Sequence, residues 1–337
     1  FGSSLPLRLF CWNLVGVLRS TTQPTLRPAM KPPADDARES FARAEKAMKS
    51  SWFSGPDYLT ASMEFAAAAN KYRAAGMLSE CCTAWLRTAE VKQKDRDLFG
   101  AGRAYESAAA LFQQNISLGG TDAAAIYWRK GVECFRLAGK GDIAVKLILK
   151  LIAVDEKAGN IAEAKASFED IIDIFQSDEK DHELTETYKQ YIGFLVRSGE
   201  LEDALRAIDS HITVLIRLKH TAFVCKEVLA KVVLCICLDD MVRADEALNA
   251  REALGWYMSK ECEVGMALVA AYKEQDSEAA TLVLQDQILV SLQVDVARLA
   301  KRLKPPAAAG GPSVQHTNPQ AEAKEEPEPL SNAELMM

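Results

Sequence analysis

The sequence predicts an all-α protein, and three observations support that prediction. Alanine is abundant, whereas the β-branched and aromatic runs that are typical of strands are scarce. Turn signals recur about every 20 residues along most of the chain. Between these signals, apolar residues keep the spacing of one helix face, as in Ala164, Phe168, Ile171, Ile172 and Phe175.

Short stretches rich in glycine or polar residues mark the expected helix ends. They lie at residues 74–76, 119–120, 139–141, 158–160, 180–181, 198–200, 219–220 and 239–240. A helix of about 15 residues and a turn fill each unit, because glycine readily takes the left-handed conformation that ends a helix. Two units form a hairpin, which must stack on a neighbour to bury its second face. The pattern predicts a tetratricopeptide-like right-handed α-solenoid of helical hairpins with a C-terminal helical bundle.

Changes in composition divide the chain into four expected segments. Residues 1–37 are predicted to be an N-terminal leader or disordered, and residues 38–258 form the helical-repeat solenoid. Residues 259–304 form the bundle, with an apolar stripe that includes Leu282. Residues 305–337 hold five glutamates and one lysine among many prolines, glycines and alanines, which predicts a disordered acidic tail.

The N-terminal residues do not predict a membrane span. Residues 5–18 are apolar but too short to cross a bilayer, and no basic region precedes them as in a signal peptide. Met30 stands just before a polar segment and is our hypothesis for the native start of translation.

Charge and cysteine usage exclude several classes of protein. A formal net charge of −7 argues against nucleic-acid binding, because no basic excess is present to displace counterions. The cysteines form no CxxC pair and no Cys/His spacing suited to zinc, so we expect buried free thiols in a reducing compartment. They are Cys11, Cys81, Cys82, Cys134, Cys225, Cys235, Cys237 and Cys262.

No pattern of catalytic residues stands out in the sequence. There is no GxxxxGK[ST] phosphate loop, and Tyr105 stands where a dinucleotide fingerprint starting at Gly100 needs its third glycine. We therefore expect Gly100 and Gly102 to be close-packing positions in a helix. His182, His211 and His220 are expected near helix ends, in caps or solvated turns. Asp239 and Asp240 are expected to be turn and N-cap groups. The prediction is a binding protein with no cofactor or metal.

Several segments resemble the soluble NSF attachment protein (SNAP) family. GPDYLTASMEFAAAANKYRAAGML (residues 55–78) is similar to its first hairpin and DLFGAGRAYESAAALF (97–112) to its next repeat. SKECEVGMALVAAYKEQDS (259–277) is similar to the start of its C-terminal bundle. FLVRSGELEDAL (194–205) and VVLCICLDDMVRADEAL (232–248) resemble the gamma branch more than the alpha branch.

The resemblance covers about residues 38–304 in unbroken order. It implies a non-enzymatic adaptor in vesicle-mediated transport and membrane fusion, which binds assembled SNARE four-helix complexes. The adaptor would recruit the AAA ATPase NSF, which supplies the work of disassembly. The resemblance further implies a cytoplasmic protein peripherally associated with vesicle, Golgi, endosomal or vacuolar membranes.

The resemblance also implies site residues. SWFSG, with Trp52 and Phe53, is similar to the family's aromatic loop that enters the bilayer interface; the alternative is that both rings pack on the first hairpin. Glu274, Gln275 and Asp276 match an acidic turn that contacts the ATPase, although they could equally be a solvated helix end. Leu335 is a poor match to a leucine near the end of alpha-type members.

Basic residues of the solenoid are the candidates for contact with SNARE complexes, which are acidic. They are Lys92, Lys94, Arg96, Lys130, Arg197 and Lys231. The alternative is that these charges are only solvated. Two other readings of the whole chain stay open. A tetratricopeptide-like scaffold or co-chaperone would bind a peptide tail, but no basic carboxylate clamp is visible. A helical-repeat enzyme is disfavoured by the missing nucleophile, base and metal cluster.

Overall fold

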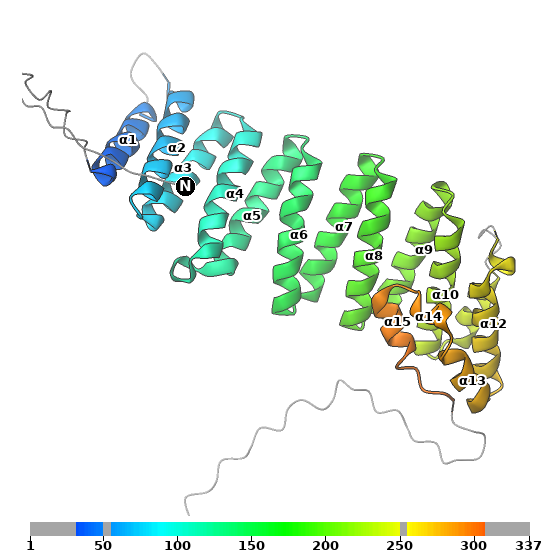
Figure 1. Ribbon diagram of the computed structural model, residues 1–337. Coiled ribbons are helices and arrows are strands. Elements are labelled where there is room, and N and C mark those ends of the chain that lie inside the picture. The colour runs from blue at the N-terminus through cyan, green and yellow to red at the C-terminus, as the bar shows by residue number, and fades with distance from the viewer. Residues whose placement is uncertain (1–31, 50–54, 250–254, 307–337) are drawn as a thin grey trace, which may run out of the picture. The chain divides into compact units, whose positions relative to one another are not determined.

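The described residues of the computed structural model are 32–49, 55–249 and 255–306, and within them the chain is helical and forms no strand (Figure 1). The chain divides into two compact units, residues 1–111 and 112–337. This confirms the predicted all-α class of stacked helices.

The first unit begins with a helical hairpin. Pro33 takes the first position of its first helix, where a missing N–H costs nothing. Phe41 packs edge-on against Phe65 with 4.9 Å between ring centroids, and Phe65 is fully buried. The unit's helices are α1 (Pro33–Ala47), α2 (Tyr58–Ala74), α3 (Leu78–Lys94) and most of α4 (Leu98–Gln114).

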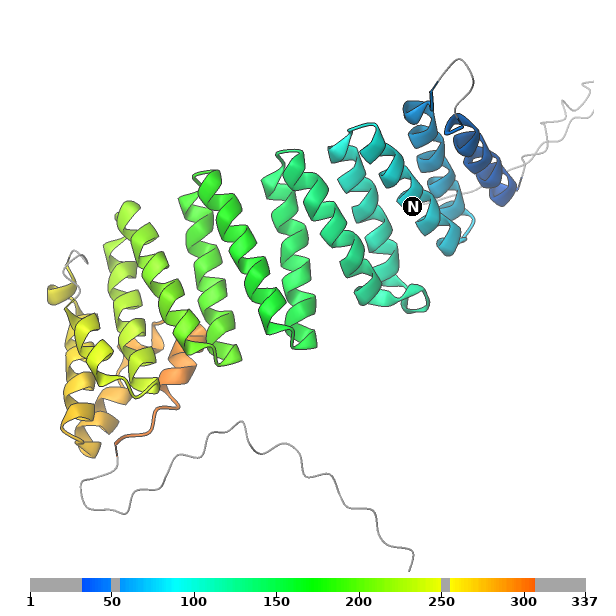
Figure 2. The same ribbon diagram turned by 180° about the vertical axis from the view of Figure 1, so that it is seen from behind.

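The second unit stacks its helices in chain order, and Figures 1 and 2 show α5 to α10 as a row of neighbours. The even-numbered helices α6, α8 and α10 are nearer the viewer in Figure 1, and the odd-numbered ones in Figure 2. The row consists of α5 (Gly120–Leu137), α6 (Gly141–Ala158), α7 (Ile161–Ser177), α8 (Asp181–Ser198), α9 (Leu201–Arg217) and α10 (Thr221–Cys237).

The turns of the second unit fall where the sequence predicts them. Gly159 and Gly199 end their helices in the left-handed conformation, with φ of 75° and 79°. Lys219 and Asp239 adopt the same conformation at φ of 58° although they carry side chains. The polar turn signals therefore mark helix ends as reliably as the glycines do.

Apolar side chains fill the layers between these helices. Leu147, Ile171 and Leu195 are almost fully buried, on α6, α7 and α8. The Phe168 ring stacks on that of Tyr191, with centroids 5.0 Å apart. Each helix thus buries residues against the next one along the chain, as the helical spacing predicts.

The C-terminal helices follow the solenoid as predicted, but they fold back over it. These helices are α11 (Met241–Leu248), α12 (Lys260–Lys273), α13 (Ser277–Leu284), α14 (Gln287–Val290) and α15 (Val294–Ala300). α12 packs on α10 and α11, and α15 reaches back to α8 and α10. Trp256, fully buried in a 3-10 turn (Trp256–Met258), donates from Nε1 to the Leu248 carbonyl at 2.8 Å.

Three expectations need correction. α1 begins at Pro33, so residues 33–37 belong to a helix and not to a leader. Leu282 does not join the apolar stripe of the bundle, because it is 76% exposed on the short helix α13. His211 is neither a cap nor solvated. It is fully buried within α9, with Nδ1 3.3 Å from Glu227 Oε1 and its ring stacked on Tyr188.

Other expectations agree with the structure. Gly102 is buried within α4, in line with close packing, and Asp240 caps α11 by accepting from the Arg243 N–H. The predicted leader up to residue 31 and the tail from residue 307 lie outside the described residues.

The cysteines of the described residues are free thiols, and most are buried. Burial raises the pKa of Cys82 and of Cys235 to about 11. A neutral thiol that resists ionisation is a poor nucleophile, so these cysteines act as small apolar core residues.

We predict that stability falls above pH 8.5 partly because of Cys235. An unfolded thiol ionises near pH 8.5, whereas this one, whose folded pKa is about 11, stays neutral, so rising pH favours unfolding. The effect is about 2 kcal/mol at pH 10. Urea unfolding of wild type and Cys235→Ala at pH 8 and pH 10 measures it. The stability difference between the two proteins should shift by that amount, and parallel pH profiles would contradict the prediction.

Candidate functional site

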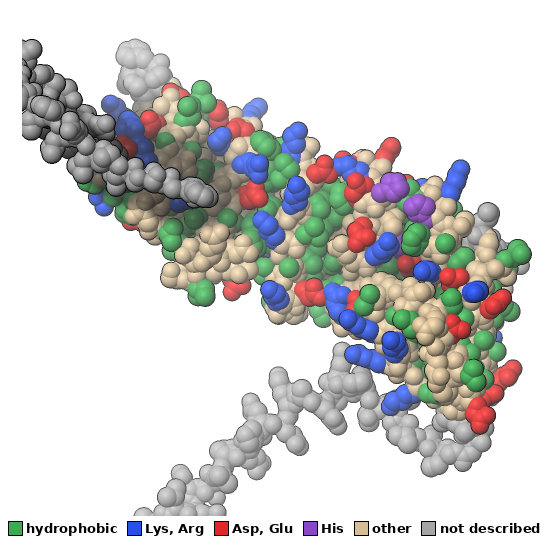
Figure 3. Space-filling view, in the orientation of Figure 1, with side chains coloured by type: hydrophobic (Ala, Val, Ile, Leu, Met, Phe, Trp, Pro, Cys, Tyr) green, Lys and Arg blue, Asp and Glu red, His purple; other side chains and the backbone are tan. Residues whose placement is uncertain are grey.

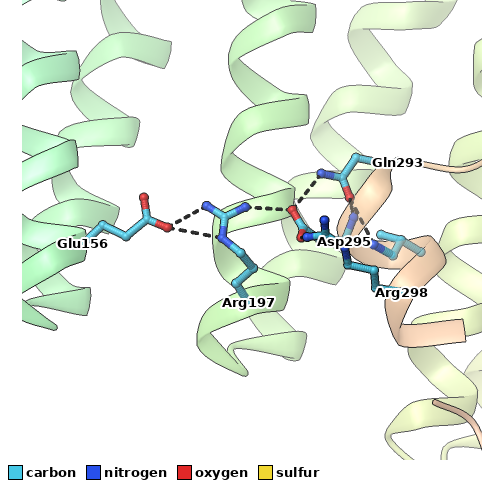
Figure 4. Close-up of polar contacts among 6 residues, drawn as sticks. Glu156, Arg197, Gln293, Asp295 and Arg298 are labelled. Atoms are coloured by element: carbon cyan, nitrogen blue, oxygen red, sulfur yellow. Dashed lines mark hydrogen bonds and ion pairs between the residues drawn. The ribbon is translucent and has the colours of Figure 1, made fainter. Parts of the chain in front are cut away.

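Arg197 joins three helices of the second unit. It lies in the last turn of α8, and its Nη2 donates to Glu156 Oε1 on α6 at 2.7 Å. Its Nη1 donates to Asp295 Oδ2 on α15, also at 2.7 Å (Figure 4). The Asp295 side chain is 8% exposed. A buried carboxylate is costly unless it is paired, so this contact fixes where α15 lies.

The start of α15 completes the surroundings of Asp295. Gln293 caps the helix, with its Oε1 accepting from the Asp295 and Val296 N–H groups at 2.8 and 3.1 Å. Gln293 Nε2 and Arg298 Nη1 donate to the Asp295 carboxylate at 3.3 and 3.1 Å. We call Glu156, Arg197, Gln293, Asp295 and Arg298 the C-terminal clasp.

Gly193 allows the clasp to close. It lies on α8 one turn before Arg197, and a Cβ there would stand 2.4 Å from Gln293 Nε2 and 2.8 Å from Asp295 Oδ2. Both distances are below normal contact. Glycine at this position therefore lets α15 approach α8 closely.

Basic side chains gather over α15 in the space-filling view (Figure 3). Arg298 is 66% exposed beyond its contact with Asp295, and Lys301, Arg302 and Lys304 are also exposed. We call these four residues the α15 basic cluster. Composition alone did not single them out, although the run ARLAKRLK carries four cations in eight residues.

Three of the expected SNARE-contacting residues lie in the first unit, at the end of α3. Lys92 is half-buried and pairs with Asp97 Oδ2 at 2.7 Å, which lowers the pKa of that carboxyl. Lys94 and Arg96 are exposed, and Arg96 takes the left-handed conformation of the turn, with φ of 63°. These two cations can reach a partner.

The other three lie on separate helices of the second unit and contact their own neighbours. Lys130, on α5, stands 5.7 Å from the Tyr127 ring centroid. Lys231, on α10, pairs with Asp209 of α9 at 2.6 Å. Arg197 is the centre of the clasp. The structure does not bring these three together as one patch.

The expected ATPase-contacting residues form the turn between α12 and α13. Glu274, Gln275 and Asp276 are all exposed. Gln275 adopts φ of 53°, and the Asp276 carboxylate caps α13 by accepting from the Glu278 and Ala279 N–H groups at 3.0 Å. The turn therefore presents a Glu274 carboxylate that has no partner among the described residues, while Asp276 has a structural role as well.

Comparison with known proteins agrees with this all-helical structure. The chain matches the family described as "Soluble NSF attachment protein, SNAP" over residues 35–287. The chain belongs to the SNAP family. It is also similar to the gamma-soluble NSF attachment protein of Dictyostelium discoideum, at 21% identity over 265 residues, which cover 78% of this chain and 81% of that protein. Membership gives the chain the general role of an NSF attachment adaptor in vesicle transport, a role without catalysis of its own.

Some expected site residues of this SNAP-family chain lie outside the part that the structure describes, and the described part has neither a membrane-spanning helix nor a metal site. Trp52 and Phe53, the expected membrane-contacting residues, and Leu335 in the tail lie outside the described residues. Among the helices that the structure describes, none is long and apolar enough to cross a bilayer. In the same residues, no group of three His, Cys, Asp or Glu side chains could hold a metal ion.

We predict that Arg197→Gln loosens the clasp. The substitution leaves the buried Asp295 carboxylate without its shortest partner, and we expect a loss of about 1 to 2 kcal/mol, since the guanidinium is partly exposed. Amide hydrogen exchange of α14 and α15 should then accelerate. The matched control is Arg206→Gln, because Arg206 is 73% exposed and pairs only with a nearby aspartate of its own helix among the described residues. Unchanged exchange in α15 would contradict the prediction.

Proposed function

We propose that this chain binds assembled SNARE four-helix complexes and recruits an NSF-type AAA ATPase for their ATP-dependent disassembly. The observation that supports this most is the family match, which spans most of the chain. The relative from Dictyostelium is named as an NSF attachment protein of the gamma type. The proposed role places the chain at the cytoplasmic surface of vesicle, Golgi, endosomal or vacuolar membranes.

Stacked helices suit such a role physically. A row of stacked helices, such as that of the second unit, presents a broad surface, so it can cover an elongated partner without reading one short motif. Exposed cations such as Lys94 and Arg96 would attract an acidic helical bundle and speed its association. The contribution of each exposed pair is small, so binding would depend on many of them.

The α12–α13 turn is our proposed contact for the ATPase. Glu274 and Asp276 present two carboxylates to solvent on a turn that capping holds in place. Lys273, next to them, is drawn toward α11 by an ion pair of 2.7 Å with Asp245. This pairing reduces the positive charge near the turn, which favours a basic partner surface.

The membrane contact proposed for Trp52 and Phe53 has support from the helix that follows. Leu59 and Met63 lie one turn apart on α2 and are 64% and 65% exposed. Exposed apolar side chains at this spacing form a stripe on one side of the helix. The stripe would extend an aromatic loop into a larger apolar surface for the bilayer interface.

ATP-dependent disassembly of a purified SNARE complex by NSF, with and without this protein, tests the proposed function. We expect disassembly only when the protein is present. Neither binding nor disassembly with several SNARE complexes would overturn the proposal and favour a helical scaffold for another partner.

We predict that Glu274→Gln combined with Asp276→Asn weakens NSF recruitment by about two- to tenfold, the range expected for losing two exposed charge contacts. Asparagine is a good N-cap, so the second change removes the charge but keeps the start of α13. Recruitment of NSF to a complex of this protein with SNAREs gives the measurement. Glu263→Gln, which neutralises an exposed carboxylate in the first turn of α12, is the control. Equal recruitment by both variants would argue against this turn as the contact.

We predict that Trp52→Ser with Phe53→Ser reduces vesicle binding by about tenfold or more, because two large apolar side chains no longer enter the interface. Flotation with phosphatidylcholine–phosphatidylserine vesicles measures the effect. Ile116→Ser with Met258→Ser removes two apolar side chains that are 91% and 93% exposed elsewhere, and this control should float like wild type. Equal flotation of all three proteins would count against the aromatic loop.

A further inference from the structure

Most cations of the α15 basic cluster have no charge partner among the described residues. Among the described residues, Lys301, Arg302 and Lys304 form no ion pair, and all three side chains are exposed. From Val294 to Lys304 the segment has four basic side chains against one acidic one, Asp295, for a net charge of +3. Asp295 is already neutralised within the clasp. The cluster thus presents a local positive charge with no counterpart among the described residues.

A groove lies beside the cluster and includes two of its arginines in its lining. It has a volume of about 320 Å³ and is lined by Arg197, Arg298 and Arg302, by the Asp295 carboxylate that the first two contact, and by Val196 and Leu299. Guanidinium groups are planar forks that match carboxylates, and they are more weakly hydrated than ammonium groups. Arg197 and Arg298 already donate to Asp295, so Arg302 is the guanidinium of this groove that remains for a further carboxylate, such as a glutamate side chain, among the described residues.

The chain itself carries glutamates a short distance beyond the cluster. The segment AEAKEEPEP follows Pro306 after a stretch of alanine, glycine, proline and polar residues. Residues 322–328, which we call the acidic block, have a net charge of −3 from four glutamates and one lysine. The glutamates are Glu322, Glu325, Glu326 and Glu328. The charges of the two segments are opposite and equal in size.

The spacing allows contact between them. Fifteen residues lie between Pro306 and the acidic block, and they cannot span more than about 54 Å. As a random coil, a linker of that length spans about 20 to 23 Å. A tether of this kind gives an effective concentration in the millimolar range. Weak charge contacts are then sufficient for docking within one molecule, whereas a second copy would need a comparable protein concentration.

We propose that the acidic block docks on the α15 basic cluster of the same chain. Its glutamates pair with Lys301, Arg302 and Lys304, and the docked block covers the groove beside Arg197. The contact is reversible, since it depends on exposed charges that salt screens. Any acidic partner that uses this end of the solenoid must displace the block. Docking goes beyond the proposed adaptor role and does not depend on it.

NMR of the ¹⁵N-labelled full-length chain tests the docking directly, without SNAREs or NSF. The probes are the backbone amide signals of the four block glutamates. They are compared in wild type and in Lys301→Gln with Arg302→Gln, at about 0.1 M and about 1 M salt, where the screening length falls from roughly 10 Å to 3 Å. The control is Lys146→Gln with Lys157→Gln, which removes two exposed charges from α6.

Docking predicts different block signals in wild type and in the α15 variant at low salt, with at least half of the difference lost at high salt. The control should match wild type, and the signals should not change with protein concentration. Identical block signals in wild type and the α15 variant at low salt would overturn the proposal. A shift that grows with protein concentration would also overturn it, because the block would then bind a second copy.

Discussion

Each helical hairpin of this chain has two apolar faces but can bury only one within itself. The neighbouring hairpin must cover the second face, and the buried side chains of α6, α7 and α8 show this arrangement in the second unit. Burial of a Leu or Ile contributes about 1.5 to 3 kcal/mol, so the stacking of neighbours is the main stabilising term. The last pair of a stack has no next neighbour. The apolar face of this last pair must still be covered, and in this protein the C-terminal helices cover it.

The C-terminal helices cover this face by folding back over the end of the stack, and they form a cap on it. α12 covers α10 and α11, while α15 returns to α8 and α10. Apolar contacts of Leu289 and Val296 bury one side of this cap. They are not specific for register, since a short helix that is held by apolar contacts alone can slide along its neighbour. The pairing of Arg197 with the buried Asp295 adds a directional contact, and a misplaced α15 would bury this carboxylate without its shortest partner.

Local patterns predicted the helices well, because helical spacing and left-handed turn residues are visible in consecutive residues. Even the turns without glycine at Lys219 and Asp239 are visible as polar breaks. The clasp was not predictable in the same way. Arg197 and Asp295 are separated by 98 residues, and nothing in their surrounding sequence pairs them. The prediction that His211 is solvated was wrong for a related reason, because its burial depends on Tyr188 and Glu227 of the two neighbouring helices.

The contacts of the clasp also decide which basic residues of this protein are available to an acidic partner. From the sequence alone, paired and unpaired cations cannot be distinguished, so every lysine and arginine on a repeat is equally available to an acidic partner. Arg197 and Lys231 already satisfy carboxylates at 2.7 and 2.6 Å, so a partner would have to compete with those contacts. Lys301, Arg302 and Lys304 form no ion pair within the part of the chain that the structure describes, so a partner has no such contact to break there. Because α15 packs on α8, cations that are unpaired among the described residues lie beside Arg197, which is held by Glu156 and Asp295. The charge available for recognition in this part of the second unit therefore comes largely from the cap, although the cap's primary task is to cover the end of the stack.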